Sequence, residues 1–304
     1  MRGVNPMRHI EVVEVGPRDG LQNEKTVLRP QIRAELCERL VSAGVRRIEA
    51  ASFVNEDLVP QMAGAEEVFS SLVREPGVLY CGLVLNERGY ERALGAGVDE
   101  VRYALPVTES FARHNQNTTV EEALDLALHL VERARLDGVR ISVTLSVAFG
   151  CPFEGSVPQE KVVELAREVA AAGPDELVLA DTIGVAAPAQ VRALLGEILD
   201  LGPVVGCHFH NTRNTGYANA LAAVEAGVSV LDSSIGGVGG CPFAPGATGN
   251  IATEDLAYLL ERMGYETGLD LERLISCAGW LSVHLGRELP GQLYRAGAFV
   301  RAAG

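Results

Sequence analysis

Short apolar runs and amphipathic stretches alternate eight times along this chain, and no other feature constrains its fold as strongly. Each run is rich in β-branched residues and is followed by a stretch with helical periodicity. The expected strands cover residues 10–15, 46–51, 78–85, 100–105, 139–147, 177–179, 204–208 and 228–231. The expected helices cover residues 31–43, 60–72, 87–96, 120–136, 159–172, 189–199, 215–226 and 253–263. Eight such units predict an α/β fold, a single (β/α)8 (TIM) barrel.

Several of the expected helices end in a glycine-containing stop directly before a strand, as in AGVRRIE, AGVDEVR and DGVRISV. Glycine just past a helix supplies a left-handed cap, and the buried parallel strand starts a few residues later. An open doubly wound sheet is the competing architecture, but no GxGxxG follows the first strand. We predict one domain over residues 1–304, with the barrel over about 9–265 and a helical extension over about 266–304.

The charge balance excludes several classes of partner. The chain has 26 Lys and Arg against 40 Asp and Glu, a formal net charge of −14. Such a surface repels phosphate backbones, so we expect no nucleic-acid partner, and an anionic substrate must be met by a local basic cluster. The N-terminal stretch MRGVNPMRHIEVVEV lacks an apolar h-region, and no run approaches the roughly 18 residues that span a bilayer. We expect a cytoplasmic protein with no membrane partner.

Polar residues gather where the expected strands end, and the catalytic groups of a (β/α)8 barrel sit at these ends and in the loops that follow. These candidates, from the first strand to the loop after the eighth, are Arg18, Asp19, Gln22, Glu49, Ser52, Asp181, His208, His210, Cys241 and Asn250. We therefore expect the functional site at the carboxyl end of the barrel.

His208 and His210 lie two residues apart at a strand end, so both imidazoles project to one side. Two nitrogens facing the barrel axis suit a divalent metal, particularly with Asp19 approaching from the first strand. A mixed oxygen and nitrogen set favours Mg²⁺ or Mn²⁺ over structural zinc, which prefers thiolates. The alternative is a histidine-rich strand end that bonds only to neighbouring backbone.

Three further charged side chains accompany the expected metal site. Arg18 beside Asp19 either forms a simple salt bridge or stabilises an oxygen anion that develops during a reaction. Glu49 and Asp181 are interpreted as carboxylates that orient a histidine or an arginine.

Cys241 lies in a loop with five glycines between Gly236 and Gly246. Such a loop can move over a ligand and present backbone N–H groups to anions. The alternative for a single cysteine is an inert buried thiol. The histidines away from the expected site, which we interpret as structural, are His9, His129 and His284; His114, in an expected loop, is a candidate ligand contact.

Seven motifs carry a resemblance to a known family. They read GPRDGLQNE, IEAASFV, VPQM, FGCPFEG, ADTIGV, HFH and GGVGGCPFAPGATGNIATEDL, and the match around them runs from about residue 9 to about residue 285. The chain resembles the hydroxymethylglutaryl-CoA lyase family. That family belongs to a larger group of metal-dependent barrel enzymes that make or break Claisen-type carbon–carbon bonds.

The resemblance implies roles for individual residues and a homodimeric assembly. The implied metal ligands are Asp19, His208, His210 and Asn250. The implied catalytic residues are Arg18 and Cys241, with Asp19 and His208 as candidates for the base. The remaining residues that fall within family motifs, which we assign to substrate binding together with Arg18, are Gln22, Glu49, Ser52 and Asp181.

The reaction implied is a retro-aldol cleavage of (S)-3-hydroxy-3-methylglutaryl-CoA to acetyl-CoA and acetoacetate, as in leucine degradation or a parallel pathway. The metal would be chelated by the C3 hydroxyl and a carboxylate oxygen of the substrate, which lowers the pKa of the hydroxyl. Arg18 would stabilise the developing oxyanion. Cys241 would supply the proton that reaches the enolate carbon.

The chain departs from the family pattern in two places. Asn211-Thr212-Arg213 follows the HxH pair where the family reads Asp-Thr-Tyr, and Pro106-Val107-Thr108 replaces a more usual Ser-Ala-Ser. These changes leave the implied metal ligands and the cysteine intact, so they bear on the acyl group more than on the reaction type. The alternatives are a lyase for another branched 3-hydroxyacyl-CoA, a condensing synthase of the same superfamily, and a non-catalytic metal- or CoA-binding barrel.

Overall fold

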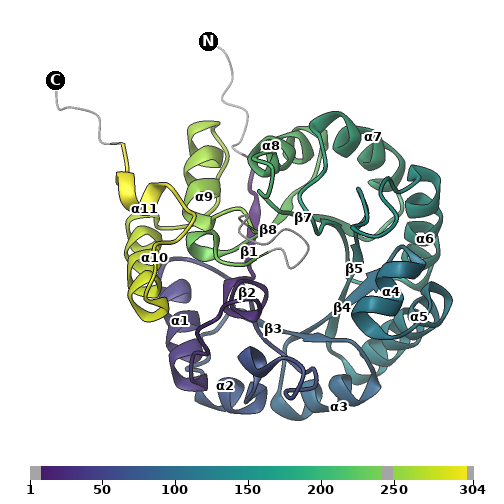
Figure 1. Cartoon of the computed structure of the whole chain (residues 1–304), viewed down its shortest axis with the longest axis horizontal. Helices are drawn as coiled ribbons and strands as arrows, with labels where there is room; N and C mark the ends of the chain where they lie inside the picture. Colours follow the sequence, from purple (N-terminus) through teal and green to yellow (C-terminus); the bar gives the residue numbers. More distant parts are fainter. Residues whose placement is uncertain (1–7, 241–248, 300–304) are drawn as a thin grey trace.

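Eight parallel strands close into a barrel in which each strand pairs with its neighbours in chain order, from β1 round to β8 and back to β1 (Figure 1). The computed structural model describes residues 8–240 and 249–299. The strands are β1 (Glu11–Glu14), β2 (Arg47–Ser52), β3 (Leu79–Val84), β4 (Glu100–Pro106), β5 (Arg140–Ser146), β6 (Glu176–Asp181), β7 (Val204–Phe209) and β8 (Val230–Ser233). The predicted (β/α)8 barrel is confirmed.

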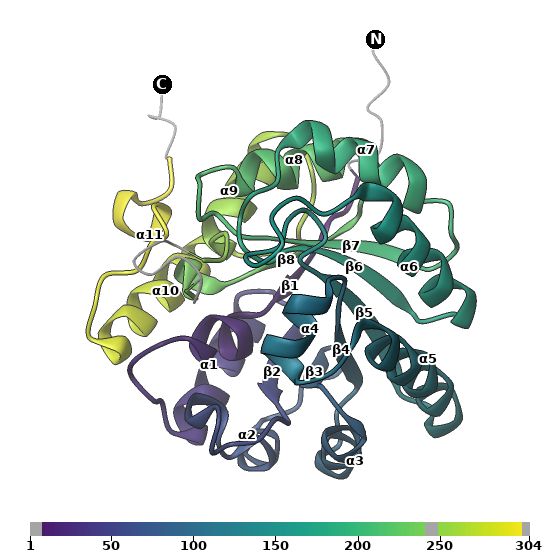
Figure 2. The ribbon, with the colours of Figure 1, turned by 45° about the vertical axis from the view of Figure 1, so that its right-hand side comes forward.

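A ring of helices surrounds this barrel (Figure 1). The helices are α1 (Pro30–Ser42), α2 (Ala65–Ser71), α3 (Glu87–Ala96), α4 (Glu109–Gln116), α5 (Val120–Asp137), α6 (Gln159–Ala172), α7 (Pro188–Ile198), α8 (Gly216–Ala226), α9 (Thr253–Arg262), α10 (Leu271–Leu285) and α11 (Leu293–Ala296). Helix α10 extends the ring beyond α9 and packs beside α1 (Figures 1 and 2). In the described part of the chain, none of them is long and apolar enough to cross a bilayer.

Local sequence signals explain most helix boundaries. Helix α5 begins at a capping box, in which the Thr119 hydroxyl accepts a bond from the Glu122 N–H and the Glu122 carboxylate accepts one from the Thr119 N–H. It ends at Gly138, which has a left-handed backbone (φ = 70°). The glycine stops therefore act as caps that turn the chain back into the next strand.

Two expectations about secondary structure were wrong. The expected helix over residues 60–72 is interrupted, because Gly64 adopts a left-handed conformation (φ = 72°) between a short turn, η2 (Pro60–Met62), and α2. The expected loop that holds His114 is instead helix α4, which begins directly after β4. Short helices of this kind have few apolar residues to mark them, and α4 buries only Phe111 and Ala112.

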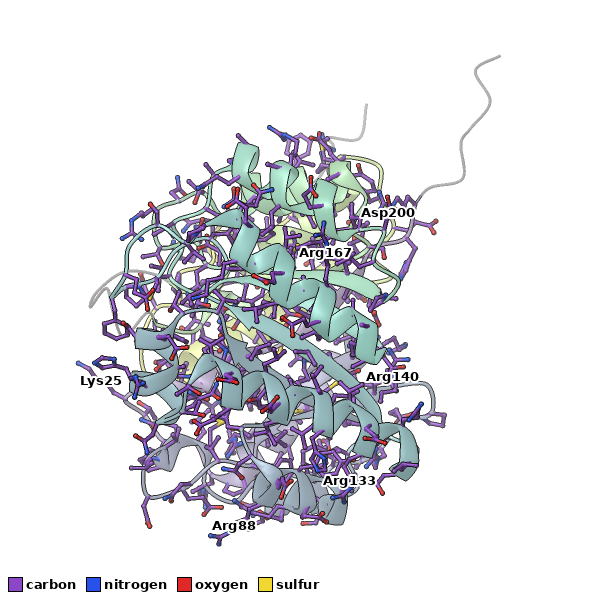
Figure 3. The ribbon with its side chains drawn as sticks, turned by 90° about the vertical axis from the view of Figure 1, so that its right-hand side faces the viewer. Lys25, Arg88, Arg133, Arg140, Arg167 and Asp200 are labelled. Atoms are coloured by element: carbon purple, nitrogen blue, oxygen red, sulfur yellow. The ribbon has the colours of Figure 1, made fainter. Side chains whose placement is uncertain are left out.

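The two ends of the barrel differ in chemistry. Figure 3 views the barrel from the side, with Lys25 at the end where loops follow the strands and Arg140 and Asp200 at the opposite end. At that opposite end a buried ion-pair group, in which Arg47 meets Glu100 and Glu176, fills the interior. The other end is hollow, and the site is built there.

Candidate active site

A cavity of about 530 Å³ opens at the carboxyl ends of the strands. Its inner wall is polar and carries the charged residues Arg18, Asp19, Glu49, Arg102, His208, His210 and Asp232. Its outer wall includes apolar side chains from β3, from the loops after β2 and β3 and from α4, namely Val54, Leu58, Val59, Leu83, Leu85 and Phe111, with polar side chains of the same loops and of α4 between them. A charged inner end under an uncharged mouth suits a ligand with a charged, reactive head and a longer, less polar tail.

The turn that follows β1, η1 (Gly16–Gly20), carries two of the charged residues, Arg18 and Asp19. It packs tightly on the segment after β8. A Cβ added to Gly20 would lie 2.6 Å from Val238 Cγ2 and 2.7 Å from Ser234 Oγ, so only glycine fits at this position. This close contact brings the first and last strands' loops together and places Asp19 beside the residues of β7.

Asp19, His208 and His210 form a cluster whose candidate ligand atoms all lie within 4.8 Å of one another. Asn250 joins this cluster, because its Nδ2 donates to Asp19 Oδ2 at 2.8 Å. Within the described part of the chain, Asn250 Oδ1 and His210 Nδ1 are buried and have no hydrogen-bond partner. A buried polar atom without a partner costs free energy, which a bound cation would recover. This mixed oxygen and nitrogen donor set therefore fits a divalent cation.

Asp232 on β8 holds His208 in place. The His208 Nδ1 lies 3.3 Å from Asp232 Oδ2, an arrangement that leaves Nε2 as the free ring nitrogen. Burial acts to lower the pKa of His208, but the hydrogen bond to Asp232 and the negative charges of Asp19 and Asp232 together outweigh it, so the pKa is raised. Burial and the neighbouring His208 lower the pKa of His210 to about 4, so this ring is neutral at pH 7 and able to bind a metal.

Arg18 lies between two carboxylates. Its NH1 donates to Asp19 Oδ1 at 2.8 Å, and its NH2 donates to Glu49 Oε2 at 2.7 Å. Burial alone would raise the pKa of Asp19, but Arg18 and the two histidines hold that pKa well below its ordinary value. Asp19 is therefore a carboxylate near neutral pH, as a metal ligand must be.

The other predicted residues have different surroundings. Gln22 lines the cavity, whereas Ser52 is buried on β2 and lies outside the cavity lining. Asp181 accepts hydrogen bonds from the backbone N–H groups of Val185 and Ala186 and so holds the loop after β6, rather than orienting a histidine or an arginine through a hydrogen bond among the described residues. Cys241 lies outside the described residues.

Arg102 and Asp232 are cavity residues that the sequence analysis missed. Arg102 donates to both Asp232 oxygens, at 3.0 and 3.1 Å, and thereby links β4 to β8 across the barrel. Both residues lie within strands and not after them, so a search of strand ends does not find them. A charged residue inside a strand that is buried on both faces is the signal that was available.

Two further histidines and Arg213, which departs from the family pattern, have distinct surroundings. His114 lines the cavity and stacks on Phe153 with ring centroids 4.1 Å apart. His129 pairs with Glu87 at the surface, which fits its structural interpretation. Arg213 donates to the carbonyls of Ile183 and Gly184 and lines a second, smaller hollow and not the main cavity.

Comparisons with known proteins agree with this geometry. The HMGL-like family model matches residues 9–280. (R)-citramalyl-CoA lyase of Chloroflexus aurantiacus is 46% identical and covers 96% of this chain and 96% of its own. The structure of HMG-CoA lyase from Bacillus subtilis is 39% identical with a TM-score of 0.93 and covers 96% of this chain and 99% of its own. The HMG-CoA lyase from Acinetobacter baumannii, solved with coenzyme A and 3-methylmalate, is 37% identical with a TM-score of 0.92 and covers 97% of both chains.

Proposed function

Because the chain belongs to the HMGL-like family, we propose that it is a divalent-metal-dependent lyase that cleaves (S)-3-hydroxy-3-methylglutaryl-CoA to acetyl-CoA and acetoacetate. One observation carries the proposal: Asp19, His208 and His210 converge within 4.8 Å at the inner end of the cavity, beside a buried arginine. Retro-aldol cleavage needs this combination. A Lewis acid must polarise an alcohol, and a fixed cation must meet the enolate oxygen that forms when the bond breaks.

Asp19, His208, His210 and Asn250 are the residues that would hold the metal. Mg²⁺ or Mn²⁺ in this set would supply Lewis-acid activation of the C3 hydroxyl and a carboxylate oxygen of the substrate. The chain's own contribution is orientation. Asn250 Nδ2 fixes Asp19, and its unpartnered Oδ1 remains available as a ligand. His208 is fixed in the same way by Asp232.

Arg18 is the candidate oxyanion partner. Glu49 and Asp19 hold its guanidinium from two sides, and its buried Nε has no hydrogen-bond partner among the described residues. As the C2–C3 bond breaks, negative charge develops on the thioester oxygen of the acetyl-CoA enolate, and a preorganised guanidinium stabilises that charge without rearranging. Gln22 lines the same wall and would contact the acyl group.

Two proton transfers complete the reaction. The C3 hydroxyl proton leaves to a base, for which His208 and Asp19 are the candidates, and either one serves only with an atom that does not hold the metal. The enolate carbon then takes a proton from an acid, for which we propose the Cys241 thiol on the loop after β8. The site returns to its starting protonation state once Cys241 and the base exchange a proton through the product or solvent.

A second substrate is favoured by one comparison. The (R)-citramalyl-CoA lyase of Chloroflexus aurantiacus is 46% identical to this chain, against 39% and 37% for the two HMG-CoA lyase structures. Citramalyl-CoA has the same branched carbinol carbon with a carboxylate one methylene closer. The same bond cleavage would yield acetyl-CoA and pyruvate. The cytoplasmic location, the homodimer and a place in leucine degradation stay predictions.

The experiment is a chromatographic assay of purified protein with each acyl-CoA, in Mg²⁺, in Mn²⁺ and in a chelator. Metal-dependent acetyl-CoA with acetoacetate supports the first substrate, and acetyl-CoA with pyruvate supports the second. Cleavage of neither acyl-CoA, by protein that still binds metal, would contradict both substrates. Protein that binds no metal would overturn the mechanism itself.

A further inference from the structure

Arg102 is a buried cation in the cavity wall that the reaction scheme above does not use. Its side chain is 3% exposed, and it lines the cavity together with the metal-ligand candidates. Its hydrogen bonds reach Asp232 on β8. Strand β8 lies on the opposite side of the closed barrel from β4 (Figure 1). A desolvated guanidinium at the inner end of a ligand cavity requires an explanation, because burying a charge costs free energy unless the charge is fully paired.

The hydrogen bonds of Arg102 use only two of the three nitrogens of its guanidinium group. Its Nε donates to Ser142 Oγ at 3.2 Å, and its NH2 donates to both oxygens of Asp232. Its NH1 lies 3.8 Å from Glu49 Oε2, which is too long for a hydrogen bond. NH1 has no hydrogen-bond partner among the residues that the structure describes. It does not belong to the fully buried polar atoms that lack a partner, so it remains accessible from the cavity. Two N–H donors therefore remain for a ligand.

The charges around Arg102 indicate what that ligand carries. The inner wall holds two guanidiniums, Arg18 and Arg102, and three carboxylates, Asp19, Glu49 and Asp232. With His208 and His210 neutral, as imidazoles that hold a metal must be, these sum to −1, and a bound divalent cation would bring the sum to +1. One further carboxylate balances the site, whereas a ligand with an uncharged acyl chain leaves an unpaired positive charge in a desolvated cavity.

We propose that Arg102 binds the free carboxylate of the acyl group through NH1, and so restricts the enzyme to acyl-CoA substrates that carry a second acid group. This inference rests on the proposed function and adds the residue that recognises the oxo-acid half of the substrate. Asp232 and Ser142 fix the guanidinium, so the contact is preorganised and the carboxylate's distance from the reacting carbon is set by the barrel. A purely structural Arg102 would serve only to neutralise Asp232.

The test compares Arg102→Lys with the wild type in binding experiments that need no turnover. Lysine keeps the charge beside Asp232 but lacks the forked donors that reach both Asp232 and a ligand. The probes, measured by calorimetry with Mn²⁺ present, are acetoacetate, pyruvate and free coenzyme A. Arg140→Lys is the matched control, since Arg140 lies at the opposite end of the barrel (Figure 3).

In Arg102→Lys we expect the affinity for the oxo acid that the wild type binds to fall about tenfold or more, as for loss of a charged hydrogen bond. The affinities for coenzyme A and Mn²⁺ should stay within about twofold of wild type, because neither ligand contacts NH1. Unchanged oxo-acid affinity would overturn the proposal, and so would an equal loss of Mn²⁺ affinity, which a structural role predicts. Since these readouts are binding constants, a wild type that binds an oxo acid but cleaves neither acyl-CoA would contradict the proposed function and leave this test intact.

Discussion

Oδ2 of Asp232 lies 3.3 Å from Nδ1 of His208, and the same carboxylate accepts two hydrogen bonds from Arg102. Burial would raise the pKa of Asp232, but Arg102 and His208 lower it to about 2, so the group stays ionised near neutral pH. One carboxylate thus joins a candidate metal ligand on β7 to a cation on β4. The metal site and the cavity floor are parts of one hydrogen-bonded network.

Asp232→Asn should weaken metal binding. Removing the charge that orients His208 and raises its basicity is expected to cost about 10- to 100-fold in affinity, as for other groups that hold a metal-ligating histidine. The measurement is the dissociation constant for Mn²⁺ by calorimetry. Asp200→Asn is the control, because Asp200 lies at the far end of the barrel (Figure 3). Equal Mn²⁺ affinity in the two variants would show that Asp232 does not support the site.

Metal should also raise the melting temperature. A cation that binds only the folded state stabilises it by about 2.7 kcal/mol at a hundredfold excess over its dissociation constant, which corresponds to a rise of several degrees. We expect the rise on adding Mn²⁺ to chelator-treated protein, followed by differential scanning fluorimetry. His210→Ala should remove most of this rise because His210 supplies one of the three clustered ligand atoms. A rise of the same size in His210→Ala would place the metal elsewhere.

The sequence and the structure agree most closely where local pattern decides the outcome. Helix α6 has the expected bounds, since Gln159–Ala172 is an uninterrupted amphipathic stretch that ends at Gly173. The metal-ligand candidates could be named because each of them lies at the end of a strand or in the loop that follows it, and a parallel barrel brings all such positions to one end.

What the sequence did not reveal depends on contacts between distant strands. Arg102 and Asp232 are 130 positions apart, and only closure of the barrel brings them together. The register between β2 and β3 shifts between Glu49 and Ala51, and no local pattern marks this irregularity beside Glu49. Asp181 is a carboxylate at the end of a strand, as a site residue would be. Its hydrogen-bond partners, however, are backbone N–H groups of the loop that follows it, and the sequence does not reveal this local role.

Cys241→Ser should abolish most turnover without loss of metal. Serine is nearly isosteric with cysteine, but its hydroxyl is a far weaker acid than a thiol, so we expect kcat to fall by about 10²- to 10⁴-fold, the range for loss of general acid–base catalysis. The Mn²⁺ dissociation constant should stay at the wild-type value. The control is Cys277→Ser, because Cys277 is buried in α10 away from the cavity. If Cys241→Ser keeps wild-type kcat, the proton comes from another group.

The unfolding free energy should fall as the pH rises from about 4.5 to about 8, because buried carboxyl groups, Glu14 and Glu254 among them, hold protons in the folded state. Burial raises the pKa of Glu14 to about 7 and that of Glu254 to about 8. Glu14 accepts bonds from the N–H groups of Gly16 and Ile235, and Glu254 accepts one from the N–H of Gly236, so the pair holds the loops after β1 and β8.

A folded-state pKa above the unfolded value favours the folded protein fully below about pH 4.5, and this advantage is lost as the pH rises through 7 to 8. The loss is on the order of a few kcal/mol for shifts of this size. In Glu254→Gln the loss that comes from Glu254 should disappear, so its unfolding free energy should change less than that of the wild type between about pH 5 and pH 8 in urea titrations. Glu288→Gln, at an exposed position, should follow the wild-type curve. Parallel curves for Glu254→Gln and the wild type would mean that Glu254 is already ionised in the folded protein at pH 7.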